Sequence, residues 1–380
     1  MAYPRRVDLT RHLHRMARDG GAVASGVCTA EPFADVAASL RQRVRDGMNA
    51  RLRFTFADPE RATSVRLTHP WARFLFVAGW SYLPAAGSPG PAAPGTVRVA
   101  RFAGEDHYRG LRRILAGIAV ELETRGFRSG VLCDDNGLVD RAAAVRAGLG
   151  WWGKNTMVLA PGVGPWMLLG SVATDAPLDT DRPMVRDCGS CDACLPACPT
   201  GALVSPGVLD ARRCLSAVLQ SPGVIPRELR PAVGDRLYGC DDCLDACPPG
   251  RRRMEAAVAP AGRHVATAVL AASDAELMDR FGHFYLPKRR PTILRRNALV
   301  VLGNQQAGGA GVLEHLRHPD WVLRAHAAWA AGRVGGRAAA QALAGAAARE
   351  QHPIVIEEID AARRLPLTEG GARLPWPATR

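Results

Sequence analysis

CGSCDACLPACP, residues 188–199, and YGCDDCLDACPP, residues 238–249, hold seven of the ten cysteines of this chain, and Cys214 lies between them. In the first segment the spacing is C-x2-C-x2-C-x3-C-P, which is typical of bacterial ferredoxins. In that pattern three close thiolates bind one [4Fe–4S] cluster and the fourth thiolate binds a second cluster. The second segment repeats the last part of the pattern, C-x2-C-x3-C-P. The sequence therefore predicts two [4Fe–4S] clusters.

The ligands are expected to divide between the two clusters in a crossed arrangement. A C-x2-C-x2-C loop wraps one face of a cluster, whereas the three-residue step before the proline turns the next thiol away. We therefore expect the first cluster to be bound by Cys188, Cys191, Cys194 and Cys247, and the second by Cys198, Cys214, Cys240 and Cys243.

Two other uses of these cysteines fit the spacing less well. Zinc sites of four thiolates usually take two C-x2-C pairs separated by a longer loop, not three thiols in one short loop. Disulfide bonds need an oxidising compartment, and the N-terminal MAYPRR is not followed by the apolar core of a signal peptide. We therefore expect a protein of the cytoplasm. Cys28 and Cys133, outside the frame, are expected to be small buried apolar groups.

The composition indicates a soluble protein with a basic bias. The 380 residues are enough for two or three domains, and 47% of them are hydrophobic and 22% charged. No uninterrupted apolar run approaches the length of a membrane span. The net charge of +13 indicates a polyanionic partner, and nucleic acid is favoured over a role in solubility alone. All but two of the basic residues are arginine, so part of the bias reflects the base composition of the gene.

The N-terminal part alternates helical and strand-like patterns. Strands are predicted over 23–29, 74–82 and 130–133, helices over 8–20, 33–45 and 107–124, and a surface loop over 83–95. This alternation favours a layered α/β domain over residues 1–175. Asp134 follows the last of these strands, where ligands bind in open α/β sheets. From position alone, an aspartate in a turn or at a helix N-cap is the more common explanation.

Three glycines surround two tryptophans in AGLGWWGKN, residues 147–155. Gly148, Gly150 and Gly153 have the spacing of a dinucleotide-binding fingerprint. The segment follows a predicted helix rather than a strand, however, and precedes a strand-like stretch at 156–159. This context disfavours a dinucleotide site. We interpret the glycines as a backbone that closely approaches a large flat group.

The C-terminal part contains an internal repeat with an offset of 29 residues. Leu-Arg-x2-Ala-x4-Gly occurs at 294–303 and again at 323–332, with a weaker copy near Ile356. Helical repeats of this kind predict HEAT-like stacking, and a plain helical cap is the simpler alternative. A basic run without acidic residues lies at the start of this region and consists of Lys288, Arg289, Arg290, Arg295 and Arg296. We expect it to contact nucleic-acid phosphates, although such runs are more often a solvated face.

Four stretches of this chain resemble the epoxyqueuosine reductase family. They are residues 134–142, AGLGWWGKNT at 147–156, the cysteine frame with YGCDDC at 238–243, and, less distinctively, LRRNALVVLGN at 294–304. The resemblance extends over residues 130–304 and, more loosely, over the N-terminal third. It implies an α/β cobalamin-binding domain at 1–175, a ferredoxin-like domain with two [4Fe–4S] clusters at 176–255, and all-α HEAT-like repeats at 256–380.

The resemblance also implies an activity and its site residues. The family uses cobalamin and two [4Fe–4S] clusters to reduce epoxyqueuosine to queuosine at the wobble position of transfer RNA. Asp134 matches the family's proton donor, and the other pocket residues are matched by Arg141, Asp106, His107 and Tyr108. The surroundings of the corrin are matched by Arg101, Trp152, Lys154 and Asn155, together with Asp134.

The partners implied are the anticodon stem-loop of tRNA and a low-potential electron donor, with no membrane and with a monomeric protein. The family often has Asp-Tyr-His where this chain has Asp106-His107-Tyr108, and Pro-Trp-Asn where it has Pro248-Pro249-Gly250. Two alternatives therefore stay open. One is a corrinoid iron–sulfur reductase of another RNA or a small molecule, and the other is an electron-transfer protein without corrin.

Overall fold

The computed structural model of the protein describes residues 6–50, 52–83, 93–255 and 263–365. The described residues form two compact units, each assembled from separate parts of the chain. The first unit takes its residues from 1–87, 105–214 and 241–259, and the second from 88–104, 215–240 and 260–380. This division differs from the three consecutive domains expected from the sequence, because two internal segments join the C-terminal helices. Most of the loop expected at 83–95 lies outside the described residues.

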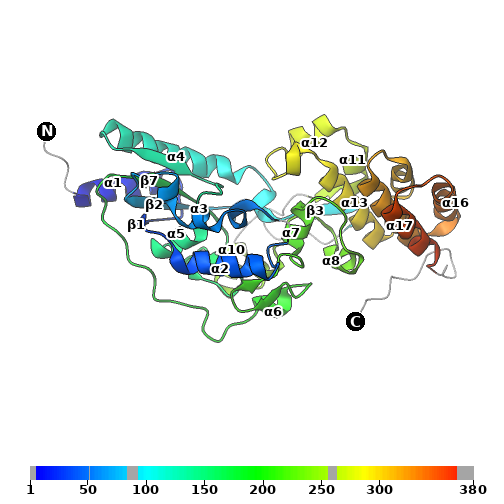
Figure 1. The fold of residues 1–380 in the computed structure, drawn as a ribbon, viewed down its shortest axis with the longest axis horizontal. Coiled ribbons are helices and arrows are strands. Elements are labelled where there is room, and N and C mark those ends of the chain that lie inside the picture. The colour runs from blue at the N-terminus through cyan, green and yellow to red at the C-terminus, as the bar shows by residue number, and fades with distance from the viewer. Residues whose placement is uncertain (1–5, 51, 84–92, 256–262, 366–380) are drawn as a thin grey trace. The chain divides into compact units, whose positions relative to one another are not determined.

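A four-stranded sheet forms the centre of the first unit (Figure 1). Its strands, in spatial order, are β1 (Ala24–Thr29), β2 (Phe74–Ser81), β7 (Met167–Thr174) and β4 (Ser129–Leu132). The strands predicted from the sequence are confirmed with small shifts at their ends. Every neighbouring pair is antiparallel. The carboxyl ends of these strands therefore do not meet at one edge, so the rule that suggested Asp134 from parallel α/β sheets does not apply here.

Helices cover both faces of this sheet because side chains alternate along its strands. On one face α1 (Arg6–Asp19) lies against Phe76, and α4 (His107–Thr124) packs on the same sheet beside α1. On the other face α5 (Asp140–Arg146) packs against Leu75 and Val77. The other helices of this unit are α2 (Ala34–Arg45), α3 (Pro59–Thr63), α6 (Cys194–Ala197), α9 (Asp242–Asp245) and α10 (Pro248–Glu255).

The cysteine segments of the first unit contain only short regular elements among the described residues. The helices α6 and α9 pack against each other, which brings the two cysteine segments together. Two small hairpins accompany them, formed by β5 (Trp151–Trp152) with β6 (Val158–Leu159) and by β8 (Leu203–Ser205) with β9 (Val208–Leu209).

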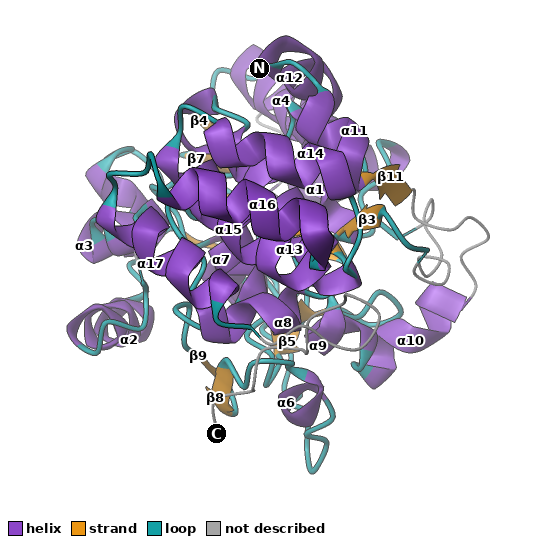
Figure 2. Cartoon of the chain, turned by 90° about the vertical axis from the view of Figure 1, so that its right-hand side faces the viewer, coloured by secondary structure: helices purple, strands orange, loops and turns teal. Residues whose placement is uncertain are grey.

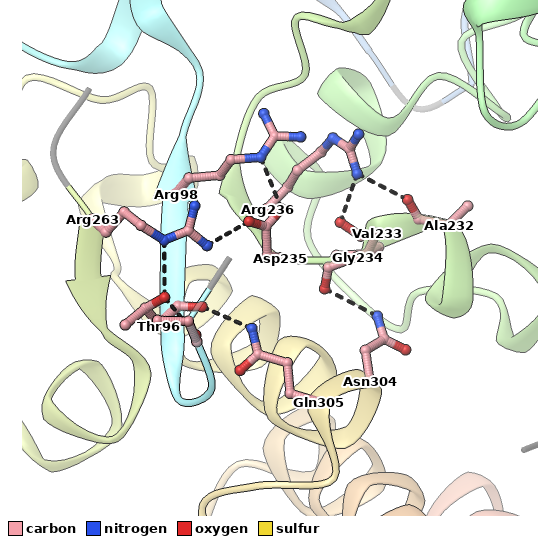
Figure 3. A network of polar contacts seen from close by, with 11 residues as sticks. Thr96, Arg98, Ala232, Val233, Gly234, Asp235, Arg236, Arg263, Asn304 and Gln305 are labelled. Atoms are coloured by element: carbon pink, nitrogen blue, oxygen red, sulfur yellow. Dashed lines mark hydrogen bonds and ion pairs between the residues drawn. The ribbon is translucent and has the colours of Figure 1, made fainter. Parts of the chain in front are cut away.

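A second sheet and a polar network join the separate segments of the second unit. The strand β3 (Thr96–Val99) lies between β10 (Arg236–Tyr238) and β11 (Arg263–Val265). The carboxylate of Asp235 accepts a 2.8 Å hydrogen bond from Arg98 and a second one from Arg263 (Figure 3). Gln305 donates to the carbonyl oxygen of Thr96 at 2.9 Å. These contacts explain why residues near 96, 235, 263 and 305 fold as one unit.

The remainder of the second unit is helical. The helices α13, α15 and α17 pack one after another, and α14 and α16 lie over them (Figure 2). Among the described residues no helix combines the length and the apolar character that crossing a membrane requires. The helices are α7 (Leu215–Gln220), α8 (Arg230–Val233), α11 (Ala266–Ala271), α12 (Asp274–Phe281), α13 (Thr292–Gln305), α14 (Gly309–Glu314), α15 (Trp321–Val334), α16 (Gly336–Ala347) and α17 (Pro353–Arg363).

The internal repeat has a packing explanation. A Cβ atom at Gly303 would lie 2.4 Å from the ring of Trp329, so α13 approaches α15 at a residue without a side chain. A Cβ atom at Gly332 would lie 2.7 Å from the Cβ atom of Ala362, so α15 approaches α17 in the same way. The glycine that ends each repeat therefore sits where successive helices come closest.

The structure corrects two residues of the predicted phosphate-binding run. Arg295 is 9% exposed and pairs with Asp274 at 2.5 Å. Arg296 is 1% exposed and donates, at 2.6–3.2 Å, to four carbonyl oxygens between Val218 and Gly223. The prediction that these two residues contact nucleic acid is wrong, because both guanidinium groups are used inside the protein.

Replacing Arg296 with Met is expected to destabilise the second unit strongly. The four carbonyl oxygens would lose their donor, and each buried unpaired group costs roughly 1–3 kcal/mol. We expect the free energy of unfolding to fall by about 3 kcal/mol or more on this basis. The matched control is Arg290→Met at an exposed position, and this variant should change the free energy of unfolding by less than about 0.5 kcal/mol. Denaturant titration followed by circular dichroism measures both, and equal effects would contradict the structural role of Arg296.

Candidate active site

The four cysteines assigned to the first cluster lie together in the first unit. Burial raises the pKa of Cys247 to about 12, with further contributions from the nearby thiols of Cys188, Cys194 and Cys191. Trp151 packs against Cys247 and Cys188 and shields this side of the group. A group of four thiols from both cysteine segments is the donor set that a [4Fe–4S] cluster requires, so these residues fit the cofactor.

Cys198 is assigned to the second cluster. Its thiol accepts hydrogen bonds from nearby backbone and side-chain groups. Burial alone would raise its pKa, but backbone N–H groups of Leu203, Thr200 and Ala202 and the hydroxyl of Thr200 lower it. The N–H of Ala202 donates to its Sγ atom at 3.2 Å. Such donors stabilise a thiolate and tune the potential of a cluster bound to it. Cys198 therefore also fits its predicted role.

The glycine-rich turn at 147–155 contacts the protein itself. A Cβ atom at Gly148 would lie 2.4 Å from the carbonyl oxygen of Arg182, and one at Gly150 would lie 2.2 Å from that of Leu159. These two glycines therefore allow close packing of the chain's own backbone, and the interpretation that they approach a flat ligand is wrong. The turn leads into the β5–β6 hairpin instead of a helix, so it lacks the strand–turn–helix context of a dinucleotide-binding fingerprint.

Two residues of this turn contact the cysteine segments. Lys154 donates a hydrogen bond from its Nζ atom to the carbonyl oxygen of Gly189 at 2.8 Å. Its positive charge opposes the rise in pKa that burial causes at Cys194. Asn155 is 3% exposed, and its side-chain amide lies 3.5 Å from the carbonyl oxygen of Cys243. Both residues were expected near the corrin. The structure places them directly against the loops that carry the cluster cysteines.

Asp134 lies in a strained turn directly after β4. Its φ of +57° is in the left-handed region, which a residue other than glycine adopts at an energetic cost. The N-cap of α5 is Val139, so the alternative that Asp134 caps this helix is wrong. Burial raises the pKa of Asp134, Arg112 opposes this shift, and Asp135 adds to it. The turn therefore presents a carboxyl group that holds its proton more strongly than an ordinary aspartate.

Other titratable groups surround Asp134. Burial raises the pKa of Tyr108, and the charges of Asp134 and Asp140 raise it further. Partial burial also raises the pKa of Cys133 to about 12, so this thiol is protonated and unreactive, although the residue is half-buried and not fully buried as predicted. Arg112 lies over the ring of Tyr108, 5.2 Å from its centroid. Together these residues form an acid cluster, which we define as Tyr108, Cys133, Asp134, Asp135 and Asp140.

Arg141 connects the acid cluster to the glycine-rich turn. Its positive charge lowers the pKa of Asp140, and it interacts electrostatically with Tyr108. Its Nη1 atom donates to the carbonyl oxygen of Thr156 at 2.9 Å. Thr156 directly follows Lys154 and Asn155, which contact the cysteine segments. Within the first unit, electrostatic interactions and hydrogen bonds therefore link the acid cluster through Arg141 and this turn to the backbone of the cysteine loops.

The remaining predicted residues have separate positions. Asp106 is the N-cap of α4 and accepts a 3.2 Å hydrogen bond from the backbone of Arg109. The buried His107 ring lies 5.9 Å from that of Tyr82. Arg101 is buried in a 3-10 turn of the second unit. Trp152 is 43% exposed and offers a flat apolar surface to a ligand.

Sequence reasoning missed two residues of this site, Arg112 and Asp140. A spacing of four residues places Arg112 on the same face of the predicted helix as Tyr108, and this signal was available in the sequence. Asp140 carried no comparable signal, because its approach to Asp134 depends on the turn between β4 and α5.

The fold and the cysteine groups define an iron–sulfur protein with an acid site built into the same unit. The family described as a 4Fe-4S double cluster binding domain matches residues 187–250. An epoxyqueuosine reductase from Bacillus subtilis is 32% identical over 360 residues, covering 90% of this chain and 92% of the relative. The chain therefore belongs to the epoxyqueuosine reductase family.

Two solved structures of the family resemble most of the chain. The crystal structure of an epoxyqueuosine reductase with a tRNA-Tyr epoxyqueuosine-modified stem loop aligns with a TM-score of 0.86 at 31% identity, covering 94% of this chain and 98% of the other. A Bacillus subtilis structure in which an aspartate catalytic loop is swung out of the active site aligns with a TM-score of 0.84 at 30% identity, with the same coverage of both chains.

Proposed function

We propose that the protein is an oxidoreductase that reduces epoxyqueuosine to queuosine at the wobble position of a tRNA anticodon. The observation that carries this proposal is the contact chain in the first unit, which links the acid cluster through Arg141 and Thr156 to the cysteine loops. Removal of an epoxide oxygen needs electrons and protons at one place. The first unit combines cysteines that fit iron–sulfur clusters with a carboxyl group suited to proton donation.

The cofactors of this reaction are two [4Fe–4S] clusters and cobalamin. The clusters carry one electron at a time, and bound cobalamin supplies a metal centre that collects two electrons for the epoxide. The crossed cysteine sets hold the clusters. We propose that the exposed ring of Trp152, with Lys154 and Asn155 of the same unit, contributes to the corrin site.

The chain's own residues position and protonate the substrate. Asp134 donates a proton to the departing oxygen, because burial keeps its carboxyl group protonated to a higher pH than usual. Tyr108 lies beside it with a raised pKa and therefore stays a neutral hydrogen-bond donor. Arg141 fixes the position of the acid cluster relative to the turn at Thr156. Asp106 supports α4 as its N-cap, which orients Tyr108 indirectly.

We propose that the helices α13–α17 form HEAT-like repeats that help to bind the tRNA. The repeated glycines and the stacked order of α13, α15 and α17 support this assignment. The exposed residues Lys288, Arg289 and Arg290 directly precede α13. They are the part of the predicted basic run that is available to phosphates. The reaction is assigned to a monomer in the cytoplasm, with electrons from a low-potential donor.

Neutralising Lys288, Arg289 and Arg290 together is expected to weaken RNA binding. Each lost phosphate contact removes released counterions, so the slope of log affinity against log salt should become less steep by up to about 3 for three contacts. The measurement is binding of a labelled anticodon stem-loop at several salt concentrations, with the three residues changed to Gln.

The matched control for this prediction changes the same number of charges elsewhere. Arg11, Arg15 and Arg18 are exposed arginines of α1 in the first unit, outside the helices proposed to bind the tRNA. Their triple replacement by Gln should leave the salt slope close to that of the natural chain. Equal slopes for both triple variants would show that residues 288–290 are only a solvated basic face.

An optical spectrum tests the cofactor requirement of the proposed function. Protein purified anaerobically and incubated with cobalamin should keep corrin bands beside the broad iron–sulfur absorption after gel filtration. It should also bind an epoxyqueuosine-modified stem-loop. Iron–sulfur absorption without retained corrin would favour an electron-transfer protein. Corrin retention without RNA binding would favour a corrinoid reductase of a small molecule.

A further inference from the structure

A second carboxyl group of the acid cluster has a structure suited to carrying a proton. Asp140 is the first residue of α5 and lies within electrostatic reach of Asp134. Its Oδ1 atom is buried and has no hydrogen-bond partner among the described residues. A buried carboxylate oxygen without a donor is unfavourable, whereas a protonated carboxyl group avoids the cost of a buried charge. The geometry therefore favours a protonated Asp140.

The groups that face Asp140 reinforce this state. Burial raises its pKa well above the ordinary value for aspartate, the charges of Asp134 and Asp135 raise it further, and Arg141 opposes them. The carboxyl groups of Asp134 and Asp140 therefore interact, and two interacting carboxyl groups favour a state in which one of them retains its proton. Among the described residues, the groups that interact electrostatically with Asp140 include Tyr108 from α4, Cys133, Asp134 and Asp135 from the turn after β4, and Arg141 from α5, and a hydrogen bond from the backbone of Asp140 itself lowers the pKa.

The stoichiometry of the proposed function creates a need for a second proton. Both C–O bonds of the epoxide break, a carbon–carbon double bond forms, and the oxygen leaves as water. This conversion consumes two electrons, delivered through the iron–sulfur clusters, and two protons. The carboxyl group of Asp134 holds one proton. A second proton must therefore reach the departing oxygen before water is released.

We propose that Asp140 is the proton reserve of Asp134. After Asp134 has protonated the departing oxygen, the carboxyl O–H of Asp140 passes its proton to the Asp134 carboxylate, directly or through one water molecule. Asp134 then delivers the second proton. Two protons from solvent restore the pair, one passing through Asp140 to Asp134 and one staying on Asp140. The inference rests on the proposed function. Asp140 acts through Asp134 and does not touch the substrate.

The variant Asp140→Asn tests this relay through its dependence on pH. Asn keeps the shape of the side chain but cannot pass on an acid proton. Turnover near neutral pH should therefore fall by roughly tenfold or more. This loss can be smaller than the usual loss for a residue that protonates the substrate itself, because Asp140 acts through Asp134. The loss should shrink as the pH falls, because solvent protons then reach Asp134 without the relay. A small weak acid such as acetic acid should restore part of the activity, and Asp140→Glu should retain most of it.

A matched control separates this effect from loss of helix charge. Asp35 is an exposed aspartate in the first turn of α2, as Asp140 is in the first turn of α5. Asp35→Asn therefore removes a similar helix-terminal charge and should leave the pH profile unchanged. A loss in Asp140→Asn that is uniform across pH and is not restored by acetic acid would overturn the relay, because it would show a structural role.

An infrared spectrum of the holoenzyme without substrate gives a second readout. The carbonyl band of a protonated carboxyl group should lose intensity at neutral pH in Asp140→Asn, and it should be unchanged in Asp35→Asn. An unchanged band in Asp140→Asn would overturn the proposal. Failure of the natural protein to reduce epoxyqueuosine would overturn the proposed function and the relay together. Failure of the relay alone is distinguishable, because the natural protein would be active and Asp140→Asn would match it.

Discussion

The variant Asp134→Asn is expected to lose roughly 100-fold or more of the turnover, the usual scale for removal of a general acid. Asn has the shape and polarity of Asp but cannot donate an acid proton to the departing oxygen. It also tolerates the left-handed backbone conformation that Asp134 adopts at a φ of +57°, so the turn should keep its structure. Rates are measured anaerobically on modified stem-loop RNA, with iron, corrin and RNA affinity measured in parallel.

Two outcomes would contradict the assignment of Asp134. Full activity of the variant would show that the carboxyl group is not the acid. Loss of corrin with retained iron would show that Asp134 builds the cofactor site. Asp35→Asn, at an exposed position in the same unit, serves as the control and should keep its full rate.

Cys247→Ala should remove one cluster and abolish turnover. Cys247 is grouped with Cys188, Cys191 and Cys194, so its loss should lower the iron content from about eight to about four per chain. Cys198→Ala should give a similar iron content, but it should lose the second cluster and keep the first. The electron paramagnetic resonance spectra of the two reduced variants should therefore differ, and their sum should resemble the natural spectrum apart from coupling between the clusters.

The control for these variants is Cys28→Ala. Cys28 is buried outside the cysteine frame, and its Sγ atom contacts the carbonyl oxygen of Ala143 at 3.7 Å. Its replacement should leave the iron content near eight, the value expected of two clusters. Identical spectra for Cys247→Ala and Cys198→Ala would contradict the crossed assignment.

The sequence predicted the parts of the site that depend on local spacing. Three cysteines of the first group, Cys188, Cys191 and Cys194, are separated by fixed short intervals, and the structure brings the distant Cys247 to them. The helix expected at 107–124 is α4 without any shift, because its leucines and isoleucines recur at helical intervals. Asp134 does follow β4 as predicted, but the sheet is antiparallel, so the rule for parallel sheets that suggested a site there does not explain its position in the acid cluster.

The features that depend on long-range packing were not predictable in the same way. The strand patterns do not specify neighbours, so the antiparallel order β1-β2-β7-β4 could not be read from them. A run of basic residues in a sequence does not show which side chains are buried. Arg295 and Arg296 are buried in the structure, and the sequence pattern did not indicate this. Gly148 and Gly150 are required by approach of the chain's own carbonyl groups, which a local pattern cannot distinguish from approach of a ligand.

The most direct test of the central claim is a single anaerobic turnover experiment. Protein loaded with both clusters and cobalamin is mixed with a reductant and epoxyqueuosine-containing tRNA, and the nucleosides are then separated and weighed by mass spectrometry. The proposed function predicts conversion to queuosine, a nucleoside lighter by one oxygen atom, which requires the loaded cofactors and is strongly reduced in Asp134→Asn. Recovery of unchanged epoxyqueuosine from a fully loaded, RNA-binding protein would contradict it.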